Sequence, residues 1–203
     1  MKKILCLFLA ATLFSFTATE DVTYNKKDKK FELSYLKETR DRLEKDIKGL
    51  SDAQLNWKAS DSTWSIANCI EHIALAEKNL FDMAMPSLKE AANPAKRSEM
   101  KYTDEQLIKI ITDRSFKAKA PEGFRPSGQF GDAHGALTTF LERRQNTINF
   151  FKTNKEDLRN HFVAHPFLGT VDTYQMLLFM TGHTLRHTLQ IEEVMANPSF
   201  PKQ

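Results

Sequence analysis

The sequence predicts an all-α protein, a four-helix bundle with a long connection between its second and third helices. Apolar residues recur at helical spacing in four segments of about twenty residues, the number and length of helices that such a bundle needs. The 203-residue chain contains only 7 Gly and 7 Pro, too few for the many tight turns of an all-β domain. No stretch alternates between apolar and polar residues long enough to predict a strand.

The first nineteen residues have the pattern of a secretory signal peptide. Lys2 and Lys3 precede a largely apolar run over residues 4–16, and small polar residues follow it. This run is too short to span a bilayer, which takes about twenty residues. We therefore expect residues 1–19 to be removed and the mature chain to be exported to the periplasm or the medium, without stable membrane insertion. The bundle is expected as one domain over residues 20–203.

The mature chain is nearly neutral and has a single cysteine. Removing Lys2 and Lys3 from the 29 basic residues leaves a near balance with the 26 acidic ones. A nucleic-acid partner would require a basic surface, so this balance argues against one. Cys69 has no second cysteine to pair with, and its apolar helical surroundings indicate a buried side chain rather than a reactive thiol.

Capping residues set the expected limits of the first helices. The first long helix is expected over residues 29–49. Ser51, with a glutamine three residues later, forms a capping box for a short helix over residues 52–56. Ser65 is the expected N-cap of the second long helix, which ends before Pro94 because proline disfavours a helical residue before it.

The second half of the chain follows the same rules of capping and helix termination. Its expected elements are a short helix over residues 104–112 capped by Thr103, a glycine- and proline-rich loop over 117–131, the third long helix over 132–153, a further helical turn over 154–161, and the fourth long helix from Asp172 to about Ala196. The stretch of about 40 residues between the second and third long helices is long enough to form a crossover or a lid.

The fourth helix carries the most informative side chains. One continuous seam recurs in steps of four and three, and its members are Met176, Met180, His183, His187, Gln190 and Val194. A bundle helix turns such a seam toward its partners, so His183 and His187 are expected to point inward. An unpartnered buried polar group costs about 1–3 kcal/mol. Two imidazoles therefore need nearby carboxylates, buried water or a metal ion as partners.

The two histidines also have the spacing of a metal site. Side chains at i and i+4 have Cβ atoms about 5–6 Å apart, close enough for both rings to reach one ion. A catalytic zinc site takes three protein ligands and a water, and His72 on the second helix offers the third ligand. The sequence therefore predicts metal ligation by His72, His183 and His187, with Gln190 or Asn68 as hydrogen-bond partners of the ligands. A histidine core without metal is the alternative.

Other polar residues have less specific patterns. Glu77 lies within the apolar stripe of the second helix, so we expect a buried ion pair with Arg144 of the third helix or, alternatively, an acid–base role. Arg186 is expected to be solvated or in a salt bridge, or to bind an anionic substrate. The remaining histidines are expected at the surface or in hydrogen bonds, and they are His134, His161 and His165.

Four short segments carry motifs in a characteristic order and spacing. These segments are Asp61 to His72 with its Trp-Ser-Ile and Glu-His, Gly182 to Gln190 with its His-x-x-x-His, Leu50 to Trp57, and His165 to Gly169. Together they resemble the DinB-like superfamily, which includes the YfiT-type proteins. The resemblance extends over about residues 31–196.

The resemblance implies a four-helix bundle in which His72, His183 and His187 hold a divalent metal ion. It also implies a small-molecule substrate, which in characterised members includes a low-molecular-weight thiol, and a homodimer. Imidazole suits several ions, so Zn²⁺ or Ni²⁺ is expected first, with Mn²⁺ or Fe²⁺ as alternatives. Two functions stay open, since no catalytic residue is assigned. One is a metal-dependent enzyme that activates a thiol or water for S-transfer or hydrolysis, and the other is a non-catalytic exported bundle that binds a metal or ligand.

Overall fold

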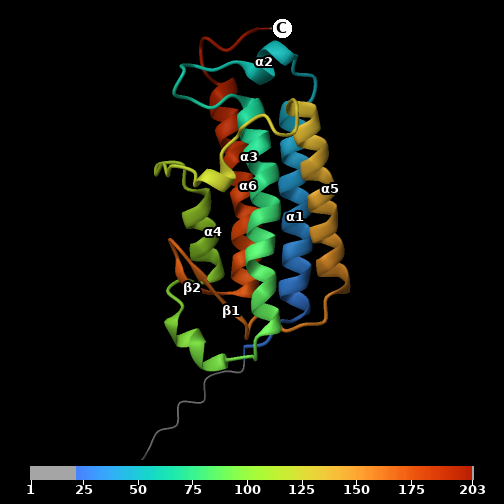
Figure 1. Cartoon of the computed structure of the whole chain (residues 1–203), viewed down its shortest axis with the longest axis vertical. Helices are drawn as coiled ribbons and strands as arrows, with labels where there is room; N and C mark the ends of the chain where they lie inside the picture. Colours follow the sequence, from blue (N-terminus) through green and yellow to red (C-terminus); the bar gives the residue numbers. More distant parts are fainter. Residues whose placement is uncertain (1–21, 203) are drawn as a thin grey trace, which may run out of the picture.

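The computed structural model describes residues 22–202, so the signal peptide predicted over residues 1–19 lies outside the described part. Its long helices form a bundle, which confirms the predicted fold class (Figure 1). These helices are α1 (Lys26–Ile47), α3 (Ile66–Ala84), α5 (Ala133–Thr153) and α6 (Thr173–Met195). None of the described helices has both the length and the apolar character that crossing a bilayer demands.

The order of the helices around the bundle explains the long connection. α1 packs against α5 and α6, and α3 packs against the same two helices. α1 and α6 run in one direction and α3 and α5 in the other (Figure 1). Because α3 and α5 are parallel neighbours, residues 85–132 must return along the whole length of the bundle.

Shorter elements lie in the connections and at the ends of the bundle. They are α2 (Asp52–Asn56), the 3₁₀ turns η1 (Met85–Lys89), η2 (Pro94–Glu99) and η3 (Glu122–Phe124), α4 (Asp104–Thr112), and the strands β1 (Phe162–His165) and β2 (Gly169–Asp172). α4 packs on the outside of α6. The two strands pair antiparallel from Phe162 opposite Asp172 to His165 opposite Gly169.

The predicted helix caps are present. Each N-cap side chain accepts the backbone N–H of the third helical residue, and the confirmed caps are Ser51, Ser65, Thr103 and Asp172. α1 begins at Lys26 rather than residue 29, because Asn25 caps it and forms a capping box with Asp28. It ends at Ile47, and Gly49 with a φ of 80° turns the chain toward α2.

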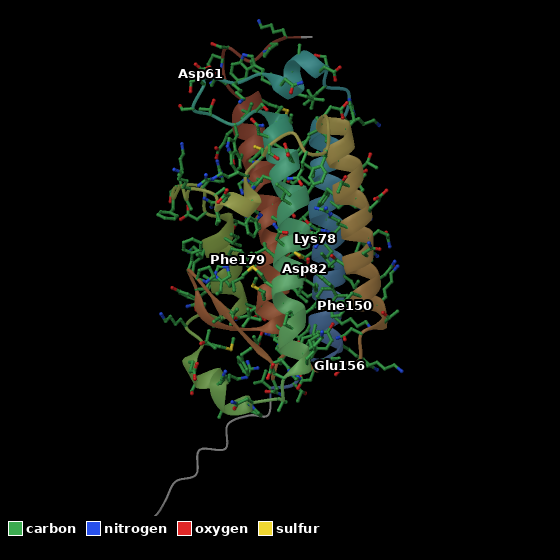
Figure 2. All side chains as sticks on the ribbon, in the orientation of Figure 1. Asp61, Lys78, Asp82, Phe150, Glu156 and Phe179 are labelled. Atoms are coloured by element: carbon green, nitrogen blue, oxygen red, sulfur yellow. The ribbon has the colours of Figure 1, made fainter. Side chains whose placement is uncertain are left out.

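Apolar side chains of all four long helices fill the interior (Figure 2). Leu36, Leu43, Ile70 and Phe140 have no solvent-exposed surface. Cys69 is also fully buried, and burial raises the pKa of its thiol to about 12. A thiol that stays protonated is a poor nucleophile, so the prediction of a structural cysteine is confirmed.

A buried ion pair and its hydrogen bonds connect all four long helices. Arg144 of α5 forms two hydrogen bonds of 2.8 Å with the carboxylate of Glu77 on α3. The same guanidinium donates to Leu36 O at 2.9 Å and Thr39 Oγ1 at 2.8 Å on α1, and to Thr184 Oγ1 at 2.7 Å on α6. The expected buried ion pair between Glu77 and Arg144 is therefore confirmed.

Two expectations about the segment before α6 were wrong. Residues 154–161 form turns rather than a helix. The hairpin of β1 and β2 was not predicted, because two strands of four residues are too short to show an alternating pattern. Gly169 has a φ of 78°, which suits glycine at the turn that joins these strands.

Candidate metal centre

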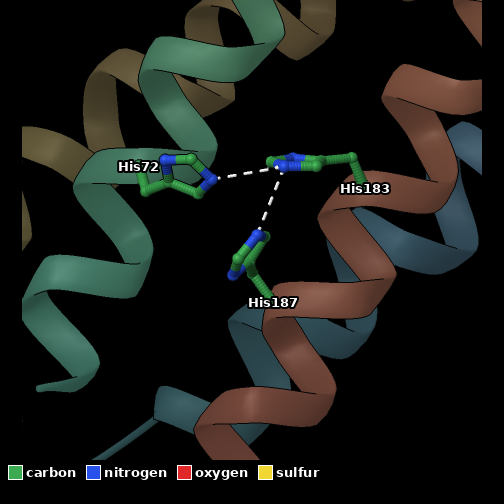
Figure 3. Close-up of side chains that lie close together, drawn as sticks. All are labelled: His72, His183 and His187. Atoms are coloured by element: carbon green, nitrogen blue, oxygen red, sulfur yellow. Dashed lines mark hydrogen bonds between the residues drawn. The ribbon is translucent and has the colours of Figure 1, made fainter. Parts of the chain in front are cut away.

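Three histidine rings converge from two facing helices. His72 lies on α3, and His183 and His187 lie one turn apart on α6, with their rings turned toward one another (Figure 3). The Nε2 atom of His183 lies 3.2 Å from Nε2 of His72 and 3.2 Å from Nε2 of His187. Nitrogens bound to one tetrahedral ion at about 2.0–2.1 Å lie about 3.4 Å apart. The spacing of the rings therefore fits a single ion.

Hydrogen bonds on the far side of two rings fix their tautomers. His72 Nδ1 lies 2.6 Å from the carbonyl oxygen of Phe124, and His187 Nδ1 lies 2.9 Å from Oε1 of Gln190. Because these oxygens accept, each Nδ1 carries the proton of a neutral ring. Each Nε2 then presents a lone pair to the centre, as in metal sites whose ligands are oriented by a carbonyl or amide partner.

The three Nε2 atoms cannot all be paired by hydrogen bonds among the rings, whereas one cation could bind all of them. A neutral His183 has one N–H, so its Nε2 can donate to His72 or to His187 but not to both. If Nε2 of His183 carries that proton and donates it to one neighbour, the Nε2 lone pair of the other neighbour still lies 3.2 Å away without a donor. A divalent ion would accept all three Nε2 lone pairs at once, so the residues present fit the metal that the sequence predicts.

Burial keeps all three rings neutral. It lowers the pKa of His72 to about 4 and the pKa values of His183 and His187 well below the usual value for histidine. The positive charge that each neighbouring ring would carry lowers the pKa values of His183 and His187 further. Neutral imidazole is the form that binds metal, so the site is ready for an ion at pH 7.

The loop between α4 and α5 is attached to α3 beside His72. The carboxylate of Glu71 accepts the backbone N–H groups of residues 127–129 at 2.9–3.1 Å. Asn79 donates to the carbonyl of Gly123 at 2.9 Å. Together with the hydrogen bond of His72 to the same loop, these contacts hold the long connection over the site.

Arg186 has a different role from either of those expected. Its guanidinium is largely buried and donates to the backbone carbonyls of Ile111, Asp113 and Phe116. It therefore holds the end of α4 against α6, and within residues 22–202 it forms no salt bridge and leaves no free anion site. Gly182, one turn earlier on α6, lets Ile111 approach closely, because a Cβ there would lie 2.6 Å from Ile111 Cγ2.

A cavity of about 580 Å³ opens beside the histidines. α4, the following loop, the β1–β2 hairpin and α6 form its walls, which include Phe116, Phe124, Phe167 and Phe179. Trp64 also lines the cavity, with its ring centroid 4.8 Å from that of His72. The cavity therefore has room for a small molecule, and its walls beside the three rings are mainly apolar.

The other polar residues that the sequence analysis named lie outside the three-histidine cluster. Asn68 accepts the backbone N–H of Ser65 and caps α3, so it is not a partner of the histidines. His161 is buried with its Nδ1 3.0 Å from the carbonyl of Ser87, whereas His134 is exposed. His165 was expected at the surface or in a hydrogen bond. It is buried in the cavity wall, where its Nδ1 accepts two backbone N–H groups.

Fold and site together define a four-helix bundle with a three-histidine centre at the edge of an apolar cavity. The sequence model of the DinB superfamily matches residues 35–191, and the chain belongs to this family. It is 28% identical over 163 residues to the uncharacterized protein YuaE of Bacillus subtilis, a match that covers 80% of this chain and 96% of that protein.

A solved structure has a similar fold. The chain resembles YfiT from Bacillus subtilis, described as "a probable metal-dependent hydrolase with an unusual four-helix bundle topology", with a TM-score of 0.57 and 18% sequence identity. The match covers 85% of this chain and 88% of that one. At this identity the likeness shows the fold alone.

Proposed function

We propose that this protein is a metal-dependent enzyme in which His72, His183 and His187 hold one divalent ion at the cavity. The observation that carries the proposal is the convergence of three Nε2 atoms, with 3.2 Å between His183 and each neighbour. An ion held by these three imidazoles would supply an acidified water or thiol as nucleophile near neutral pH.

The residues around the centre have separate tasks in this proposal. Phe124 O and Gln190 keep the Nε2 lone pairs of His72 and His187 directed inward. Trp64 packs on both of these rings, with ring centroids 4.8 and 5.9 Å apart, and limits their movement. The apolar cavity displaces water from the substrate and thereby strengthens the polar interactions formed at the centre.

Water is the nucleophile to test first, and hydrolysis the reaction. YfiT, whose fold is similar, is described as a metal-dependent hydrolase, and this description supports the choice. Thiol S-transfer is tested in parallel, with Zn²⁺ and Ni²⁺ as the first ions because both accept imidazole ligands. The substrate is a small molecule, since the cavity has a volume of about 580 Å³.

We also propose that the protein acts outside the cytoplasm. The support is the pattern of residues 1–19 together with the start of the fold, because α1 begins only at Lys26 with its own cap at Asn25. Intact-mass measurement on protein expressed with its leader tests this. A mature chain shorter by about nineteen residues in the exported fraction is expected, and a full-length chain in the cytoplasm would contradict it.

Elemental analysis of the purified protein tests the metal site. We expect about one divalent ion per chain in the wild type and no stoichiometric metal in His183→Ala. His134→Ala is the matched control, because this histidine is exposed and lies outside the centre. Equal metal content in wild type and His183→Ala would overturn the ligand assignment.

Turnover assays then separate the enzyme from its alternative. Ester, amide and thiol-conjugation substrates are compared with loaded and chelated protein, and a reaction that needs both the ion and His183 is expected. Bound metal without turnover of any substrate in the panel would favour the non-catalytic metal-binding bundle.

A further inference from the structure

His165 is the fourth histidine at the cavity, and its tautomer is fixed by the hairpin turn. Its Nδ1 accepts the backbone N–H groups of Phe167 and Leu168, each at 3.2 Å. A nitrogen that accepts carries no proton, so the proton of the neutral ring lies on Nε2. Burial lowers the pKa of His165 to about 4, which keeps the ring in this neutral form.

The Nε2–H group of His165 faces the cavity rather than the protein. The hydrogen bonds of His165 to residues 22–202 all involve Nδ1, and Nε2 is not among the fully buried polar atoms, although the side chain as a whole is only 5% exposed and lines the cavity. The ring of Phe179, with its centroid 4.6 Å away, forms the apolar wall beside it. An oriented donor in a mainly apolar wall is an arrangement by which pockets fix the direction of a ligand.

The mouth of the same cavity exposes apolar side chains. Met83, Ile110, Phe116 and Phe167 line it and are 38%, 44%, 70% and 73% exposed. They account for most of the large apolar side chains that the described part of the chain leaves in contact with solvent. A group of exposed apolar residues around a cavity indicates a ligand that covers them.

The arginines at the cavity already have partners. Arg114 forms a bidentate pair with Glu193 at 2.9 and 3.1 Å, and Arg186 donates to backbone carbonyls. Lys117 and Lys119 line the outer part, on the loop. Beside the three histidines, the uncharged donors that line the cavity include the Nε2–H of His165, the indole N–H of Trp64 and the side-chain amide of Gln190. Such donors suit an uncharged oxygen acceptor, and the hairpin turn orients the donor of His165.

We propose that the substrate has an apolar aromatic or acyl body and a carbonyl oxygen, and that His165 Nε2–H donates a hydrogen bond to this oxygen. The body lies between Phe116 and Phe167 at the mouth. This inference rests on the proposed function, since it places a carbonyl compound beside the metal centre. His165 is then a binding residue that selects and orients the substrate.

The dye 6-propionyl-2-dimethylaminonaphthalene (prodan) tests the proposal, because it is uncharged, has an aromatic body and has one ketone. Its emission moves to the blue in apolar surroundings and to the red when the ketone accepts a hydrogen bond. We expect the mature protein to bind the dye in both metal-loaded and chelated form. In wild-type protein the emission of bound dye lies to the red of that in a variant without the His165 donor.

The informative variant is His165→Asn. The Asn side-chain oxygen can take the place of Nδ1 and accept the two turn N–H groups, whereas the distal donor is lost. Affinity for prodan is expected to fall about 2–10-fold, the effect of one neutral hydrogen bond. Phe167→Ala should weaken binding by a similar factor through lost burial. Phe31→Ala is the matched control, because Phe31 is 47% exposed on α1 and lies outside the cavity.

Wild-type protein gives an independent measurement. In ¹⁵N NMR of the histidine side chains, His165 is expected as the Nε2–H tautomer, and its Nε2–H signal should shift when prodan is added. A signal that does not move, or wild-type affinity and emission in His165→Asn, would overturn the proposal. So would dye binding that depends on Lys117 and not on His165.

The two proposals fail separately. If His183→Ala retained its metal, the ligand assignment would fall, but the prodan results would stand. If prodan binding ignored His165 and Phe167 while the metal followed His183, the metal site would stand and the substrate class would be wrong.

Discussion

Replacing Arg144 tests how the bundle is held together around its centre. Arg144→Met keeps most of the side-chain volume but removes all five hydrogen bonds of the guanidinium. Glu77 then remains 1% exposed, and the hydroxyl of Thr147 at 2.9 Å is its one remaining side-chain hydrogen bond among the described residues. Breaking a buried ion pair from one side costs about 3–5 kcal/mol. For a chain of this size that cost lowers the melting temperature by about 6–20 °C.

Circular dichroism during thermal and urea unfolding measures this loss. Lys78→Met is the control, because Lys78 pairs with Asp82 on the exposed face of α3 (Figure 2), and an exposed pair is worth at most about 1 kcal/mol. Adding Glu77→Met to Arg144→Met should restore part of the stability, since no charge is then left buried alone. A loss in Arg144→Met no larger than in the control would refute the reasoning, as would a double variant no more stable than the single one.

Three further predictions concern the centre and the helices beside it. Gln190→Leu removes the hydrogen-bond acceptor at His187 Nδ1, so metal affinity measured by chelator competition should fall about 10–100-fold. Unchanged affinity would mean that Gln190 does not orient the ring of His187. Burial raises the pKa of Glu32 from 4.5 to about 7, so this carboxyl stabilises the fold below pH 4.5 and loses that contribution as the pH rises through 7. Glu32→Gln should therefore gain roughly 3 kcal/mol relative to wild type between pH 4 and pH 8 in urea titrations, and a difference that does not change with pH would contradict this. Gly182→Ala places a methyl group 2.6 Å from Ile111 Cγ2. It should destabilise the protein by about 1–3 kcal/mol and increase amide hydrogen exchange in α4. Exchange in α4 as slow as in the wild type would show that the contact of Ile111 with Gly182 does not hold this helix.

The sequence predicted the helices where side chains act locally. Ser65 and Asp172 cap helices through bonds to residues three positions away, so neighbouring sequence is sufficient to place them. The inward seam of α6 likewise follows from helical spacing, and with it the meeting of His183 and His187. His72 could be added because a stripe of apolar residues already defined the buried face of its helix.

The parts that sequence reasoning missed depend on contacts between distant segments. His165 becomes a cavity residue because the β1–β2 turn folds against α6 near Phe179, and strands of four residues give no periodic signal. Arg186 binds carbonyls at the end of α4, and no local pattern encodes that partner. Asn68 was placed near the metal by helical position, yet its own helix cap takes the side chain instead.

The most direct test of the account is X-ray absorption at the edge of the bound metal in the purified mature protein. We predict three imidazole nitrogens in the first coordination shell at about 2.0–2.1 Å if the ion is Zn²⁺, and only two in the variant His72→Phe. A spectrum without imidazole scattering, or one that His72→Phe leaves unchanged, would show that the three rings do not hold the ion.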